Sequence, residues 1–147
     1  MKSLMLLGLM VLFTVTSSLA YSVQDENSIL DRTPASKPEI QDSQGKQLSY
    51  ILVDQQVLIV ADVTNALDKQ QPFTYIVQIQ DNDEVVVSLG WLSGSLSPNQ
   101  RLSPALSWTP LYPGTYRATV FVWEAINIPS PLSPSIFLDI EVRLAEV

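Results

Sequence analysis

Short segments in which apolar and polar residues alternate recur along most of this chain, and this feature limits the fold more than any other. A period of two residues places alternate side chains on opposite faces of a β-strand. Such segments lie at residues 38–40, 56–64, 73–80, 85–91, 102–108, 115–124 and 136–144. Turn residues (Pro, Gly, Asn, Asp and Ser) separate them. No ten-residue stretch after residue 20 combines a helical period with helix caps, so we expect an all-β fold.

The number and spacing of these segments predict a seven-stranded antiparallel sandwich of the immunoglobulin-like (Ig-like) or fibronectin-III-like kind. Tyr116 follows Pro113 and Gly114 at the start of the penultimate strand, where a tyrosine corner lies in such folds. We expect its ring in the core and its hydroxyl bonded to a backbone group upstream. The chain has no cysteine, so burial alone must hold the domain together.

The first 20 residues have the pattern of a secretory signal peptide. Lys2 supplies a positive charge, residues 4–15 are apolar, and Ser18 and Ala20 are the small residues that precede a cleavage site. The alternative is an uncleaved anchor, although about 12 apolar residues fall short of the roughly 20 that span a bilayer. We predict cleavage after Ala20, no membrane span in the mature chain, and an extracellular or cell-surface location.

Residues 21–37 are polar and contain only three aliphatic side chains, so we interpret them as a flexible linker. The Ig-like domain is then expected to span residues 38–147.

Composition removes many kinds of chemistry. Without His or Cys the chain can form no Ser-His-Asp triad, no catalytic thiol and no Cys/His zinc site. The net charge of −7, with no basic patch, argues against nucleic acid as a partner. We expect no catalytic residue, no cofactor and no metal, and hence no enzyme. Weak calcium binding at Asp81–Asp83 stays open, although Asp and Asn also suit a hairpin turn there.

The strand pattern leaves an excess of apolar side chains on a face that should meet solvent. If 73–80, 115–124 and 136–144 are neighbours in one sheet, four large side chains gather at one end of its outer face: Ile76, Phe121, Trp123 and Phe137. The Pro-rich loop 125–134 should add Ile126, Ile128 and Leu132 there. A contiguous apolar group of this kind indicates an interaction patch. The alternative is that the linker or this loop covers it.

Several segments carry a resemblance to a known family: 74–80 (TYIVQIQ), 102–110 (LSPALSWTP), 113–116 (PGTY) and 118–124 (ATVFVWE). Together they resemble the Ig-like, CARDB-type modules of archaeal cell-surface and secreted proteins, over roughly residues 50–143. The resemblance implies an adhesion, spacer or assembly role without chemistry.

Two functions therefore stay open. The first is a non-catalytic secreted or cell-surface module for adhesion, protein interaction or assembly, whose partner is a protein, a cell-surface polymer or a second copy of itself. The second is an accessory or carbohydrate-binding domain that acts with an extracellular enzyme. A cleft with two converging carboxylates would favour the second, and a flat sheet with an aromatic patch the first.

Overall fold

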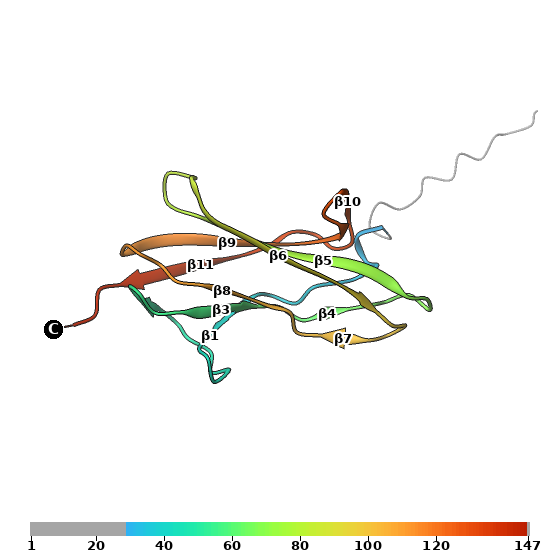
Figure 1. Ribbon diagram of the computed structural model, residues 1–147, viewed down its shortest axis with the longest axis horizontal. Helices are drawn as coiled ribbons and strands as arrows, with labels where there is room; N and C mark the ends of the chain where they lie inside the picture. The colour runs from blue at the N-terminus through green and yellow to red at the C-terminus, as the bar shows by residue number, and fades with distance from the viewer. Residues whose placement is uncertain (1–28, 147) are drawn as a thin grey trace, which may run out of the picture.

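The chain folds as a sandwich of β-strands in two layers (Figure 1). The computed structural model describes residues 29–146, so the expected signal peptide and the first part of the expected linker lie outside the described residues. None of the described residues belongs to a helix with the length and hydropathy that a membrane span needs. The all-β sandwich expected from the alternating pattern is confirmed.

The larger sheet holds six strands in the order β2-β11-β9-β5-β6, with β10 paired to β9. All pairs are antiparallel except β2 with β11. The strands are β2 (Ile51–Leu52), β5 (Gln71–Gln80), β6 (Val86–Leu96), β9 (Gly114–Ala125), β10 (Ile128–Pro131) and β11 (Ile136–Arg143). The expected neighbours 73–80, 115–124 and 136–144 therefore lie side by side, as β5, β9 and β11.

The second layer is built from shorter pieces. Its three-stranded sheet has the order β1-β3-β8, and a separate pair joins β4 to β7. Their bounds are β1 (Glu39–Gln41), β3 (Val57–Val60), β4 (Val63–Thr64), β7 (Arg101–Leu102) and β8 (Ala105–Trp108).

The expected strands 56–64 and 102–108 are each broken in two, and β2 and β10 were not expected, so seven expected strands become eleven. The break in the first falls at Asp62, whose N–H donates to Ser36 Oγ at 2.9 Å instead of to a neighbouring strand. The break in the second falls before Ala105 at Pro104, which has no N–H to give to a ladder.

The core lies between the layers and is formed by the inward residues of the alternating segments. Phe73, Tyr75, Val77 and Ile79 of β5 are all buried, as the pattern predicts. The hydroxyl of Tyr75 donates to the carbonyl of Ile59 at 3.3 Å, which satisfies the polar end of a fully buried ring.

Tyr116 forms the expected tyrosine corner. Its side chain is 9% exposed, and its hydroxyl donates to the carbonyl oxygen of Tyr112 at 2.9 Å. The ring packs edge-on against Trp108 with centroids 5.1 Å apart. Burial, with a contribution from the negative charge of Asp81, raises the pKa of the hydroxyl, which keeps it protonated as a donor.

Part of the segment assigned to the flexible linker is tied to the sandwich. The N–H of Thr33 donates to the carbonyl of Leu132 at 3.0 Å, and Ala35 forms a β-bridge with Val63. Ser36 bonds to Asp62 in both directions, through its N–H and through its hydroxyl. The ordered domain therefore begins before Pro38. Hydrogen bonds hold these residues, and such bonds leave no hydrophobic pattern in the sequence from which they could be predicted.

Candidate functional site

The outward side chains of the larger sheet form the candidate site. Antiparallel register aligns them in rows across β6, β5, β9 and β11. This outer face consists of Leu89, Trp91, Thr74, Ile76, Gln78, Thr119, Phe121, Trp123 and Phe137. Six of these nine are large and apolar, on the side of the sheet away from the core.

Strand β6 has an inverted pattern that helps to create this face. Its small residues Ser88 and Gly90 turn inward, where a Cβ on Gly90 would lie 3.7 Å from Leu106. Its large residues Leu89 and Trp91 turn outward and are 55% and 53% exposed. A strand that serves only the core would bury its large apolar residues and expose its small ones. Folding alone therefore does not explain why Leu89 and Trp91 face outward.

The central row runs from Trp91 through Ile76 to Phe121. Ile76 points outward as the sequence predicts, yet it is only 4% exposed. The prediction that it is an exposed contact residue is corrected here: bulky cross-strand neighbours on both sides cover it, since directly opposed side chains lie within about 5.5 Å at Cβ. Ile76 therefore supports the face from beneath.

The next row places Trp123 opposite Thr74, with Ser93 on the far side. The hydroxyls of Thr74 and Ser93 hydrogen-bond at 2.8 Å, and Thr74 is fully buried. The rings of Phe121 and Trp123 lie 6.0 Å apart at their centroids and are tilted by 55°. Phe121 and Trp123, two of the three aromatic residues named from the sequence, are thus in contact and half-buried.

Phe137 is the most exposed of the predicted patch residues, at 55%. The guanidinium of Arg117 lies 4.5 Å from the centre of its ring. Arg117 also donates two hydrogen bonds to Asp139, from Nε at 2.8 Å and from Nη2 at 3.3 Å. That bond lowers the pKa of the Asp139 carboxyl, so the pair stays charged and fixes the cation over the ring.

The loop 125–134 extends the sheet and does not fold over the outer face. Within it, β10 pairs with the end of β9, so that Pro131 lies opposite Trp123 on the side away from β5. Ile126 and Ile128 are about half exposed at this hairpin, as the sequence predicts. Leu132, also expected to be presented, is fully buried, because its N–H donates to the carbonyl of Val122 and draws it into the core.

Leu89 and Trp91 were missed by the sequence reasoning, which treated 85–91 only as a hairpin partner. The signal was present, because small residues alternate with large ones in Ser88-Leu89-Gly90-Trp91. Ser88 and Gly90 were placed within the predicted strand, but which of its side chains face the core was not predicted.

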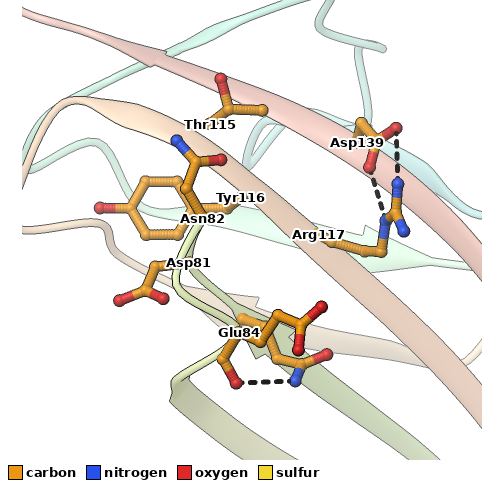
Figure 2. A pocket seen from close by; sticks show the side chains of 8 residues that line it. Asp81, Asn82, Glu84, Thr115, Tyr116, Arg117 and Asp139 are labelled. Atoms are coloured by element: carbon orange, nitrogen blue, oxygen red, sulfur yellow. Dashed lines mark hydrogen bonds and ion pairs between the residues drawn. The ribbon is translucent and has the colours of Figure 1, made fainter.

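A polar hollow of about 360 Å³ lies at the opposite end of β9 from Trp123 (Figure 2). It is lined by side chains of the β5–β6 turn and of β9 and β11: Gln80, Asp81, Asn82, Glu84, Thr115, Tyr116, Arg117 and Asp139. Asp81 Oδ1 accepts the N–H groups of Asp83 and Val85, each at 3.0 Å, which is the bonding of a hairpin turn.

Among residues 29–146, no group of three or more His, Cys, Asp or Glu side chains is arranged to hold a metal ion. Two of the three carboxylates that line the hollow are instead bonded within the protein, Asp81 to the turn and Asp139 to Arg117.

Comparison with known proteins agrees with a surface module. The sequence model of the S-layer A-like family matches residues 28–142. No curated protein sequence matches the chain.

Solved structures show the same fold. A CARDB domain from Pyrococcus furiosus, crystallised with di-metal ions, is 19% identical, with a TM-score of 0.53 over 76% of this chain and 87% of that one. The C-terminal domain of wzt is 14% identical, with a TM-score of 0.62 over 78% and 75% of the two chains.

A β-glucosidase from Listeria innocua is 12% identical, with a TM-score of 0.57, and the match covers 78% of this chain but 16% of the enzyme. At these identities the likeness establishes the fold, and the CARDB-type, Ig-like resemblance stated from the sequence is confirmed.

Proposed function

Because the chain belongs to the S-layer A-like family, we propose that it is a non-catalytic cell-surface module that binds an envelope protein through its outer face. The family match and the CARDB-type fold support a location at the cell surface. The expected signal peptide is consistent with export to that location.

The observation that carries the proposal is the group of apolar side chains on the outer side of the sheet, away from the core. Leu89 and Trp91 of β6 and Phe137 of β11 are each more than half exposed, and they lie on the two sides of the half-buried pair Phe121 and Trp123 of β9. Burying apolar surface gains about 25 cal/mol per Å², and aromatic anchors in interfaces commonly contribute 2 kcal/mol or more each. A partner that covered this face would bury these side chains, and their burial would stabilise the complex.

The composition of the face favours a protein partner over a polysaccharide. Sugar hydroxyls need hydrogen bonds when they leave water. Of the three polar side chains on this face, Thr74 is already bonded to Ser93, so only Gln78 and Thr119 remain for a sugar beside six large apolar side chains. An apolar protein surface makes no such demand, and it fits the flat shape of a sheet better than a glycan chain that needs a groove.

The test is a double variant, Trp123→Ser with Phe137→Ser, compared with the wild-type chain for sedimentation with cell envelopes stripped of the native protein. The structure predicts that binding falls at least about tenfold, while the melting temperature changes by only a few degrees, because Phe137 is exposed and Trp123 half-buried. Phe137→Ser alone is the milder variant if the double one is unstable.

The control is Leu111→Ser with Leu144→Ser, which removes two apolar side chains that are each 66% exposed and lie off the outer face. The control should bind as the wild type does. Equal binding by all three proteins would overturn the proposal. The envelopes can also be replaced by purified envelope protein or by purified envelope polysaccharide. Binding to the polysaccharide but not to the protein would favour the carbohydrate-binding alternative.

A further inference from the structure

Strand β6 is the open edge of the larger sheet. It ends the order β2-β11-β9-β5-β6, and within residues 29–146 no strand pairs with its outer side. It is 11 residues long, whereas β2 at the opposite edge has two. The edge strands of the smaller sheet, β1 and β8, have three and four residues. Strand β6 is therefore much longer than these three edge strands.

Proteins usually block an exposed edge with Lys, Pro, a short strand or an inward charge. From Val86 to Leu96, β6 contains no charged residue and no proline. Its register with β5 is regular except for one irregularity next to Gln80, close to the turn. The edge thus offers its free N–H and C=O groups over most of its length without a device that repels a second strand.

We propose that β6 pairs antiparallel with β6 of a second copy of this chain, which joins two larger sheets into one. The interface is separate from the envelope contact proposed above, because it is made by the backbone edge and not by the outer face. Around a two-fold axis near Gly90, Leu89 of one copy would lie opposite Trp91 of the other. The outer face would then continue across both copies.

The self-complementarity of β6 about Gly90 points to a second copy as the occupant. The chain carries a net charge of −7, so two copies repel where charged surfaces meet and can approach closely only through an uncharged one. Strand β6 is such a surface and is the same on both partners, as a two-fold interface requires. Its outward side chains are apolar on both sides of the axis, so the pairing matches like with like.

The first experiment measures the distance between the same residue in the two copies of the dimer. The chain has no cysteine, so one introduced cysteine can carry a single spin label. Leu89 and Phe137 are both 55% exposed on the same face, but Phe137 lies three strands from β6. With strands about 4.8 Å apart, labels at Phe137→Cys should be roughly 34 Å apart in the paired dimer, and labels at Leu89→Cys under about 10 Å.

The expected result is dipolar broadening and crosslinking by a short bis-maleimide for Leu89→Cys, with neither for Phe137→Cys. A dimer with the opposite pattern, close at Phe137 and distant at Leu89, would overturn the proposal in favour of face-to-face packing. A chain that remains monomeric by analytical ultracentrifugation up to millimolar concentration would also overturn it.

The second experiment introduces a charge into β6 and measures dimerisation. Leu89→Lys and Leu89→Glu should each weaken dimerisation at least about tenfold, since a charge then lies against Trp91 of the other copy and the two like charges lie diagonally about 7–8 Å apart across the axis. An equimolar mixture of the two should restore it. The Trp123→Ser, Phe137→Ser double variant should still dimerise, so failure of the envelope contact and failure of edge pairing are distinguishable. Dimerisation of both charged variants at the wild-type affinity would overturn the proposal.

Discussion

Replacing Tyr116 with phenylalanine isolates one hydrogen bond of the corner. The lost bond is the 2.9 Å contact to the Tyr112 carbonyl, and the ring keeps its place against Trp108. A neutral hydrogen bond of this kind contributes about 1 kcal/mol, so the free energy of unfolding should fall by that amount. For a domain of this size the melting temperature should fall by about 4 °C.

Replacing Tyr116 with alanine also removes the buried ring and its edge-on contact. Large aromatic-to-alanine changes in a core cost about 3–5 kcal/mol, and the aromatic pair adds about 1 kcal/mol. Urea unfolding followed by tryptophan fluorescence measures both variants. Tyr112→Phe is the matched control, because the Tyr112 side chain is 72% exposed and only its backbone accepts the bond. A Phe variant as stable as the wild type, or an Ala variant no worse than the Phe variant, would refute this account of the corner.

Three further changes test the fold and its electrostatics. Gly94→Ala would place a Cβ 3.1 Å from the ring of Phe73 and should destabilise by about 1–3 kcal/mol, measured by thermal unfolding. Asn65→Ala removes three bonds from a buried amide to backbone carbonyls and should cost about 2–3 kcal/mol in urea unfolding. The Arg117 bond lowers the pKa of Asp139 below its ordinary 3.8, so the stability that it adds is present above that pH and lost as the pH falls through the folded value. The difference in urea midpoint between wild type and Asp139→Asn should therefore shrink between pH 6 and pH 3, and a constant difference would contradict the assignment.

The alternating pattern predicted the sheet because the inward side chains of β5, β9 and β11 recur with a period of two, although Thr74 and Ile76 on the outer side of β5 are buried as well. Tyr116 was predicted from the turn before it, and Phe121, Trp123 and Phe137 were predicted to be close because antiparallel register follows from strand order. Such features depend on residues near one another in the sequence or on a simple period.

Features that depend on neighbours across the sheet were not predictable in this way. Ile76 is covered by Trp91 of β6, and which side chains of that strand face outward was not predicted. Gly94 lies within β6, where its lack of a side chain leaves room for the ring of Phe73, and the sequence suggested a loop at that position. Leu132 lies in a loop with three prolines, yet its side chain is buried in the core and its N–H donates to the carbonyl of Val122.

The central claim, that the outer face is covered by a partner on the cell surface, is tested most directly by hydroxyl-radical footprinting of intact cells and of the purified chain. Trp91, Trp123 and Phe137 report on the face, and the 72% exposed Tyr112 reports on a surface away from it. The account predicts that oxidation of the three face residues slows several-fold on cells while that of Tyr112 is unchanged. Equal oxidation rates for Trp91, Trp123 and Phe137 in both states would contradict it.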